Sequence, residues 1–168
     1  MQRIIKEQII FIPAIKSSSL EISASSAGKV KISHAEVEAL NIDASSAANV
    51  GGTYAVSGAC EIDASSAARV EIELTAKEVE CDASSSANII LSGSAEVLKA
   101  DASSAGDIKA SKFVVAVADA EASSGADIYI NATKRISAQA SSGGDVRYAG
   151  SATDIYRNAS SGGSVKKM

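Results

Sequence analysis

The chain is poor in the residues that build most catalytic centres and large cores. Its 168 residues include no tryptophan, one histidine (His34), one proline (Pro13) and only 4% aromatic residues. A serine nucleophile with a histidine base could therefore occur only once, and two cysteines without partner histidines make no zinc site. A single proline suits a body made of continuous hydrogen-bonded strands.

Further absences narrow the class of protein. Five leucines are too few for the columns of a leucine-rich repeat, and no apolar run approaches the length of a transmembrane helix. The net charge of −4 and the scarcity of aromatic residues argue against nucleic-acid binding.

What the chain has in abundance is a small tetrad built around Ser-Ser. It occurs eight times, and successive first alanines lie 18 to 20 residues apart. The copies occupy residues 24–27, 44–47, 64–67, 83–86, 102–105, 122–125, 140–143 and 159–162. A period this regular predicts one structural unit that is repeated and stacked.

Apolar residues recur at fixed offsets from each tetrad. The sixth position after the first alanine is always Val or Ile, and the positions two and four before it are mostly apolar, as with Cys60 and Ile62 before Ala64. Polar residues separate these positions, and alternation with a period of two is typical of half-buried strands. Each repeat therefore predicts one strand that runs into the tetrad and one that leaves it.

Strands repeated at this spacing predict an all-β fold. We expect a right-handed, single-stranded parallel β-helix (β-solenoid) of about eight coils, each of 18–20 residues, with a variable third side at segments such as 33–37 and 53–57. The tetrads form tight corners, where one serine of each pair is expected to point inward and to hydrogen-bond the neighbouring coil. Cys60 and Cys81 fall in different inward columns, which favours two buried free thiols over a disulfide.

The N-terminal segment carries no tetrad and does not fit the tetrad register. Its apolar run is interrupted by Lys6 and Glu7, which is unlike a signal peptide, so this chain shows no export signal. We expect residues 1–16 to be a capping strand or first coil, and residues 17–168 to form the β-solenoid domain.

The most informative functional hint is an acidic face. The positions one and three before each tetrad point outward on the same strand, and nine of the chain's 20 acidic residues occupy them, against one lysine, Lys99. The candidate binding residues are Asp43, Glu61, Asp63, Glu80, Asp82, Asp101, Asp119 and Glu121. Like charges stacked on neighbouring strands destabilise a sheet by a few tenths to about 1 kcal/mol per pair.

Three interpretations of this acidic face are open. It is a solvated face that keeps the strands soluble, a site for a cation such as calcium, or a surface for a protein or glycan partner. No other cofactor is expected. Ice binding is a weaker alternative, because charged residues flank the serines.

A second acidic column consists of Asp107, Asp127 and Asp145, five residues after the first alanines of their tetrads. Asp is common at corners, and corner chemistry is the simpler interpretation. The alternative is a carbohydrate-active enzyme that uses clustered carboxylates. Because the coil length is nearly constant, no long loop completes an active site, and the sequence predicts no catalytic residues.

The repeat resembles a bacterial family, the auto-transporter adhesin head GIN domain family. The likeness rests on units of the form Ile-Asp-Ala-Ser-Ser-Ala-x-x-Val at residues 42–50 and 62–70, and on the ending Asn-Ala-Ser-Ser-Gly-Gly-Ser-Val-Lys-Lys at residues 158–167. It covers residues 17–167. The resemblance implies a right-handed β-helix-like domain, export to the periplasm or cell surface and an adhesin role, and it brings no catalytic residues.

These features together predict a non-enzymatic, adhesin-like binding domain that presents a rigid repeated strip to a glycan or protein partner. A purely structural alternative is a homo-oligomer or larger assembly that stacks through the ends of the solenoid.

Overall fold

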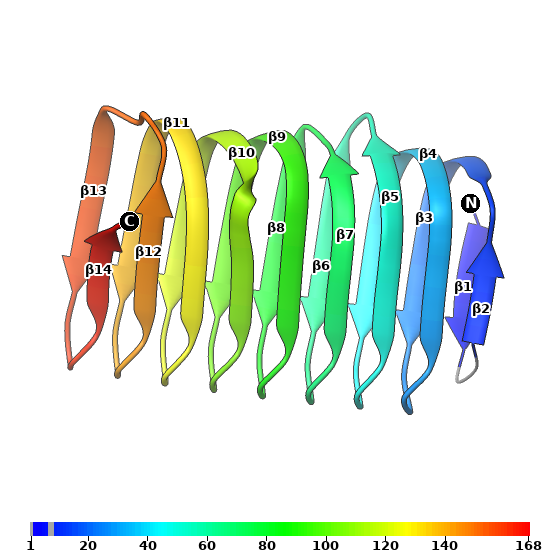
Figure 1. The fold of residues 1–168 in the computed structure, drawn as a ribbon, viewed down its shortest axis with the longest axis horizontal. Helices are drawn as coiled ribbons and strands as arrows, with labels where there is room; N and C mark the ends of the chain where they lie inside the picture. The colour runs from blue at the N-terminus through cyan, green and yellow to red at the C-terminus, as the bar shows by residue number, and fades with distance from the viewer. Residues whose placement is uncertain (1, 7–8) are drawn as a thin grey trace.

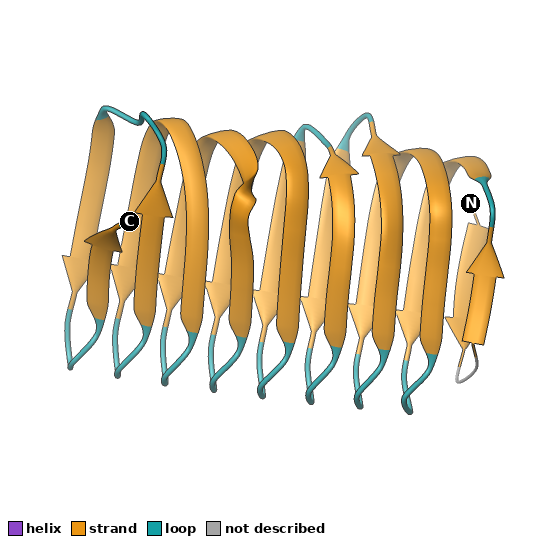
Figure 2. Cartoon of the chain, viewed as in Figure 1, coloured by secondary structure: helices purple, strands orange, loops and turns teal. Residues whose placement is uncertain are grey.

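The computed structural model describes residues 2–6 and 9–168, and the regular structure of these residues consists of strands alone (Figure 2). The strands are β1 (Gln2–Lys6), β2 (Ile9–Ile12), β3 (Ile15–Ala24), β4 (Lys29–Ala44), β5 (Asn49–Val56), β6 (Ala59–Ala64), β7 (Arg69–Thr75), β8 (Glu78–Ala83), β9 (Asn88–Ala102), β10 (Asp107–Ala122), β11 (Asp127–Ala140), β12 (Asp145–Ala149), β13 (Asp154–Ala159) and β14 (Ser164–Lys167). No helix in this part of the chain is long and apolar enough to cross a membrane.

The chain winds as a single-stranded solenoid (Figure 1). It rises on the side nearer the viewer, crosses the top, descends behind and advances from right to left, so the coil is right-handed. Each strand pairs in parallel with its counterpart about one repeat away, as Val30 with Val50 and Val50 with Val70. The predicted right-handed parallel β-solenoid of about eight coils is confirmed.

Each coil has two long sides and one short side. We call the strands that run into the tetrads the approach face: residues 20–24, 40–44, 60–64, 79–83, 98–102, 118–122, 136–140 and 155–159. The strands that leave the tetrads form the return face: residues 29–32, 49–52, 69–72, 88–91, 107–110, 127–130, 145–148 and 164–167. In β4 the alternation of buried and exposed residues is interrupted by two exposed pairs, at residues 33–34 and 38–39. These interruptions mark the corners of the short third side.

The core is narrow because small and β-branched side chains fill the inward columns. On the approach face the column two residues before the tetrad changes from isoleucine to alanine along the rod, as Ile42 and Ala120 illustrate, both 0% exposed. Phe113 is fully buried in the coil that contains Ala118 and Ala120. The phenyl ring of Phe113 therefore fills core volume that the two small alanine side chains do not occupy.

The two cysteines are buried and free, as predicted. Burial, with a smaller effect from the neighbouring Glu61 carboxylate, raises the pKa of the Cys60 thiol to about 12. Burial likewise raises the pKa of the Cys81 thiol, so both groups stay protonated and unreactive in the folded protein.

The tetrads form the edge at which the approach and return faces meet. In the fifth coil the N–H of Gly106 donates to the carbonyl of Ser103 at 2.9 Å, and the two residues between them, Ser104 and Ala105, have φ of 50° and 60°. This is a type I′ turn, which usually carries residues such as Asn-Gly that accept positive φ. A non-glycine residue other than Asn or Asp in the left-handed region costs roughly 1 kcal/mol, so the turn is locally unfavourable.

Neighbouring turns hold one another in this conformation. The N–H of Ala105 donates to the carbonyl of Ser124 in the next coil at 3.1 Å, and the N–H of Ser103 donates to the carbonyl of Ala83 in the preceding coil at 2.9 Å. Equivalent bonds recur along the stack. A ladder of backbone hydrogen bonds between coils therefore offsets the local strain of each turn.

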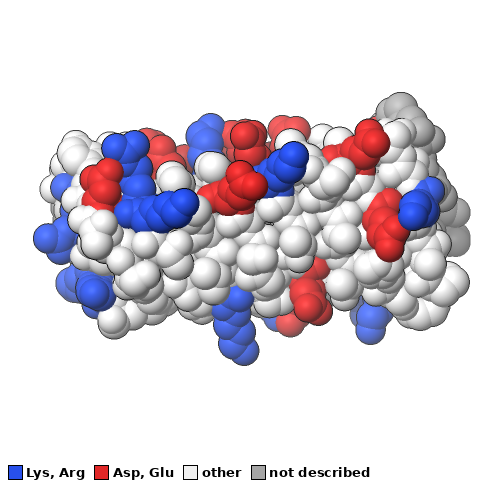
Figure 3. Space-filling model, turned by 90° about the horizontal axis from the view of Figure 1, so that it is seen from above, with Lys and Arg blue, Asp and Glu red and all other residues white. Residues whose placement is uncertain are grey.

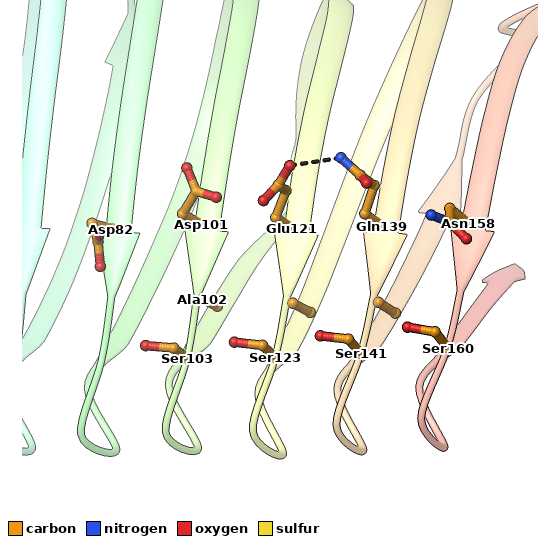
Figure 4. A pocket seen from close by; sticks show the side chains of 12 residues that line it. Asp82, Asp101, Ala102, Ser103, Glu121, Ser123, Gln139, Ser141, Asn158 and Ser160 are labelled. Carbon is orange, nitrogen blue, oxygen red and sulfur yellow. Dashed lines mark hydrogen bonds between the residues drawn. The ribbon is translucent and has the colours of Figure 1, made fainter.

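The expectation that tetrad serine hydroxyls bond the neighbouring coil is wrong. The second serine of each pair is exposed, and among the residues that the structure describes no tetrad hydroxyl makes a hydrogen bond. Figure 4 shows Ser103, Ser123, Ser141 and Ser160 in a row, with their hydroxyls pointing the same way along the stack. Because backbone N–H groups already satisfy the carbonyls of adjacent turns, the hydroxyls face solvent.

The N-terminal segment, predicted to be a capping strand or first coil, adds a further coil that pairs in register with the coil after it. β1 pairs with β3 from Gln2 and Leu20 onward, and β2 pairs with β4 from Ile9 and Lys29 onward. Backbone pairing sets this register without a tetrad. Residues 7–8, between β1 and β2, lie outside the described residues.

Candidate binding face

The approach face stacks the predicted acidic residues in two outward columns. The column next to the turns reads Ser23, Asp43, Asp63, Asp82, Asp101, Glu121, Gln139 and Asn158, and the column two residues further away reads Glu21, Asn41, Glu61, Glu80, Lys99, Asp119, Ser137 and Tyr156. All eight predicted binding residues therefore lie on one face. Neighbours within a column are separated by the strand spacing of about 4.8 Å.

The crowding of like charges acts on the carboxyl groups at the centre of the face. Partial burial raises the pKa of Asp63, and the surrounding carboxylates, Asp43 first, raise it further. Partial burial and the Glu121 carboxylate raise the pKa of Asp101, against the opposing effect of Lys99. Ionising these two groups is therefore less favourable in the folded protein than in the unfolded chain.

Two polar neighbours relieve part of this repulsion. Lys99 Nζ lies 2.6 Å from Glu80 Oε1, and this bond raises the pKa of Lys99. Gln139 Nε2 donates to Glu121 Oε1 at 2.6 Å. The Gln139 amide holds the Glu121 carboxylate in a fixed orientation, as the dashed line in Figure 4 shows.

A shallow polar groove of about 240 Å³ follows the approach face next to the turns. It runs from Asp82 on β8 to Asn158 on β13, and turn serines form its other wall. In Figure 4 the side chains of Asp101, Glu121 and Gln139 stand above this row of serines. The repeat thus presents hydroxyl and carboxylate or amide groups at the same place on successive coils.

One protein family, described as "Putative auto-transporter adhesin, head GIN domain", has a sequence profile that matches residues 51–152. The matched segment is more than half of the chain and contains five of the eight tetrads. The chain belongs to the head GIN domain family. No curated protein and no solved structure matches it.

The predicted family is confirmed, and the fold continues beyond the matched part of this head GIN domain. The unit at residues 42–50 and the ending at 158–167 lie outside residues 51–152. Both nevertheless stack in register on the matched coils, since Ile42 pairs with Ile62 and Val146 pairs with Val165.

The return face of the GIN domain differs from the approach face in its distribution of charged residues. Its two corresponding outward columns, five and seven residues after the first alanine of each tetrad, carry six cationic and four acidic residues in the eight tetrad coils. Arg69 Nη2 lies 2.9 Å from Glu71 Oε2, and Arg147 Nη2 lies 3.1 Å from Asp145 Oδ2. Cations and carboxylates two residues apart on one strand therefore pair on this face.

The second acidic column stacks as the sequence predicts, with Asp107 opposite Asp127 and Asp127 opposite Asp145. Asp107 Oδ2 accepts from Lys109 Nζ at 2.9 Å and from Asn88 Nδ2 at 3.1 Å. Partners on the same or the adjacent strand thus engage Asp107 and Asp145, which favours the structural interpretation of this column over the enzymatic one.

The short third side is also balanced in charge. Figure 3 looks down on this edge and shows acidic and basic groups next to one another. Lys16 Nζ lies 2.9 Å from Glu36 Oε2, and Arg135 Nε lies 2.6 Å from Asp154 Oδ2. His34, the one histidine of the chain, is exposed with its Nε2 3.5 Å from Glu36 Oε1. The approach face is the exception among the three sides.

Calcium remains a prediction for the acidic face. In the part of the chain that the structure describes, no three His, Cys, Asp or Glu side chains lie close enough together to hold a metal ion. Titration calorimetry with calcium tests the prediction: heat in the wild type that is lost when Asp63, Asp82 and Asp101 become Asn would support it.

Sequence reasoning overlooked the neutral end of the approach face. Gln139 and Asn158 continue the acidic column as amides, and Tyr156 is 58% exposed on the adjoining column. A search for carboxylates passes over these residues. The signal was present in the repeat, because the same offsets from the tetrads at 140–143 and 159–162 identify them.

Proposed function

We propose that this head GIN domain is a non-enzymatic binding module that engages a basic partner through the acidic columns of its approach face. The observation that carries the proposal is the contrast between faces built from the same coils. On the return face Glu71, Asp107 and Asp145 each pair with a cation on their own strand, although Asp107, Asp127 and Asp145 also stack there. On the approach face Asp43, Asp63, Asp82 and Asp101 stack on four successive coils, and the single lysine of the two columns, Lys99, pairs with Glu80.

This contrast weakens the interpretation that the acidic face only keeps the strands soluble. The return face also faces solvent, and it carries charges of both signs. Partial burial first, and the stacked carboxylates second, raise the pKa values of Asp63 and Asp101, so the ionised column works against folding. A partner that neutralises the column better explains why it is kept.

A repeated strip suits a partner with repeated positive charge. Each carboxylate contact with a cation at a solvated surface contributes little by itself. Contacts repeated at the coil spacing of about 4.8 Å add through avidity once the first one forms. A rigid solenoid avoids the entropic cost of ordering such a strip on binding.

The description of the family supports an adhesin-like role. On that support we infer that the domain works at the cell surface or in the periplasm. The assembly alternative makes a different prediction, since light scattering would then show a mass that rises with protein concentration.

Binding to immobilised poly-L-lysine, measured by surface plasmon resonance in about 0.15 M salt, tests the proposal. The approach variant carries Asp63→Asn, Asp82→Asn and Asp101→Asn. The return variant carries Glu71→Gln, Asp107→Asn and Asp145→Asn. Each variant loses three negative charges, so the two proteins are matched in net charge.

We expect the approach variant to bind about tenfold more weakly than the wild type, and the return variant to bind nearly as well as the wild type. Equal weakening in both variants would mean that net charge alone governs binding. The assignment of the function to the approach face would then be wrong.

A further inference from the structure

The approach face changes chemistry toward its C-terminal coils. On β8, β9 and β10 the column next to the turns consists of Asp82, Asp101 and Glu121. On β11 and β13 the same column consists of the amides Gln139 and Asn158. The backbone pairing of the coils is unchanged here, so the difference lies in the outward side chains, from carboxylates to amides, and not in the fold.

Two adjoining hollows cover this neutral end. The polar groove next to the turns reaches Gln139 and Asn158. A second hollow of about 530 Å³, further from the turns, is lined on the same strands by residues that include Ser137 and Tyr156. Because Tyr156 and Asn158 are both exposed and lie two residues apart on β13, they face solvent on the same side of the strand.

Tyr156 differs from the other tyrosines of the chain. Tyr54 and Tyr148 are buried, at 1% and 4% exposure. Tyr129 lies on the return face, where the Arg147 guanidinium covers its ring at 5.3 Å from the centroid. Among the described tyrosines, Tyr156 alone has an exposed ring, and it stands beside planar amide groups.

We propose that the approach face has a second site at its C-terminal end, formed by Tyr156, Asn158, Gln139, Ser137 and Glu121, that binds a neutral oligosaccharide. The proposal rests on the proposed function of the approach face as a binding surface. It assigns to that face a ligand class different from the basic partner of the acidic columns.

The chemistry of the site matches that of a sugar. A pyranose ring presents an apolar C–H face that packs on an aromatic ring, and Tyr supplies such a face with a polar tip. The hydroxyls of the sugar both donate and accept hydrogen bonds. Amide side chains can donate to and accept from them, and a carboxylate can accept from them. The Gln139–Glu121 bond of 2.6 Å pre-organises two of these groups.

Charge selects neutral glycans over anionic ones. Glu121, Asp101 and Asp119 border the site, and the cation that lines the second hollow, Arg135, is already paired with Asp154 at 2.6 Å. A uronic acid or sulfated sugar would therefore meet like charge there. The open shape suits a chain that lies across coils, because the polar side chains of β10, β11 and β13 follow one another along both hollows.

Saturation-transfer NMR and titration calorimetry on the full chain test the site. The probes are cello-, xylo-, manno-, malto- and chitohexaose, with an oligogalacturonate as the anionic comparison. We expect at least one neutral hexasaccharide to bind in the millimolar range or tighter, and the oligogalacturonate not to bind. Tyr156→Ala should weaken the binding by about tenfold, while Tyr156→Phe, which keeps the ring, should retain most of it.

The outcomes separate this proposal from the previous one. If the wild type binds poly-L-lysine but no neutral hexasaccharide, or if Tyr156→Ala binds sugar as the wild type does, the glycan site is wrong and the acidic face stands. If Tyr156→Ala loses sugar binding and keeps poly-L-lysine binding, the glycan site stands and is distinct from the acidic columns. Sugar binding without a difference between the approach and return variants on poly-L-lysine overturns only the proposed function.

Discussion

The approach face and the return face are built from the same coils, the same turns and the same parallel ladders. On the return face, Glu71, Asp107 and Asp145 each have a cation two residues away on their own strand, at 2.9, 2.9 and 3.1 Å. On the approach face, aspartates stack on aspartates, and the pKa values of Asp63 and Asp101 rise. Backbone architecture therefore does not dictate how a face of this solenoid arranges its charges.

The difference between the two faces indicates that the stacked carboxylates of the approach face, and not the paired charges of the return face, need a functional explanation. The return face shows that a stacked, solvated sheet of this repeat can pair its charges. The approach face keeps an arrangement that opposes folding, by a few tenths to about 1 kcal/mol for each stacked pair. We attribute that arrangement to binding and the return face to stability.

The largest expected effect tests whether the two faces share one core. Ile62 on the approach face and Ile89 on the return face are 1% and 0% exposed. Ile62→Ala and Ile89→Ala should each lower the free energy of unfolding by about 2–5 kcal/mol, because each leaves a cavity in a narrow core. Guanidinium unfolding curves measure both losses. A loss confined to one variant would mean that the faces are not equally packed, and that their outer charges cannot be compared on equal terms.

A smaller effect is expected at the turns that join the faces. Gly125 has φ of 73°, and a Cβ added there would meet nothing within 4 Å, so Gly125→Ala tests the backbone conformation alone. It should cost about 1 kcal/mol, and the reciprocal Ala67→Gly, at φ of 62°, should stabilise by a similar or smaller amount.

Thermal unfolding measures both turn variants, with a shift of roughly 2–4 °C expected for each kcal/mol in a chain of this size. Since the turns belong to both faces, these shifts should be the same at low and high salt. A shift that depends on salt would mean that the turn substitutions disturb the charge columns.

The dependence of stability on pH should differ between the faces by a still smaller amount. The raised pKa values of Asp63 and Asp101 mean that the folded protein binds these protons more tightly than the unfolded chain does. Their contribution to stability is therefore present at low pH and lost as pH rises through the folded pKa values. This contribution should decrease as pH rises from about 4, the ordinary pKa of an aspartate, and it should amount to less than about 1 kcal/mol.

The two triple variants serve as controls for this pH effect. The approach variant should lose most of the increase in stability at low pH, and the return variant should keep it. Glu36, whose pKa is lowered mainly by its bond to Lys16, acts in the opposite direction, since its contribution is lost as pH falls. An equal pH response in all three proteins would contradict the assignment to Asp63 and Asp101.

Most of the fold could be predicted from the sequence, because the apolar and polar residues recur at fixed distances from each tetrad. The tetrad spacing and a period of two are sufficient to place Asp63 opposite Asp82 without any knowledge of side-chain contacts. Once the register is known, the acidic columns follow directly, and the second column at Asp107 and Asp127 follows in the same way.

The turn conformation and the serine environment could not be predicted by local rules. Ser-Ala and Ser-Gly carry a weaker type I′ signal than Asn-Gly, so the positive φ of residues such as Ser104 and Ala105 depends on bonds to neighbouring coils. Those bonds join residues about 20 positions apart, and a local pattern does not contain them. The same backbone bonds explain why the hydroxyls of the tetrads face solvent.

The central claim is that the acidic columns are kept at a cost to stability, and one matched measurement tests it directly. The approach variant and the return variant each remove three carboxylates from a chain with net charge −4. Their free energies of unfolding, measured by guanidinium titration at pH 7 and extrapolated to water, should move in opposite directions. We expect the approach variant to be more stable than the wild type and the return variant to be less stable. A decrease in both, or an increase in both, would contradict the account.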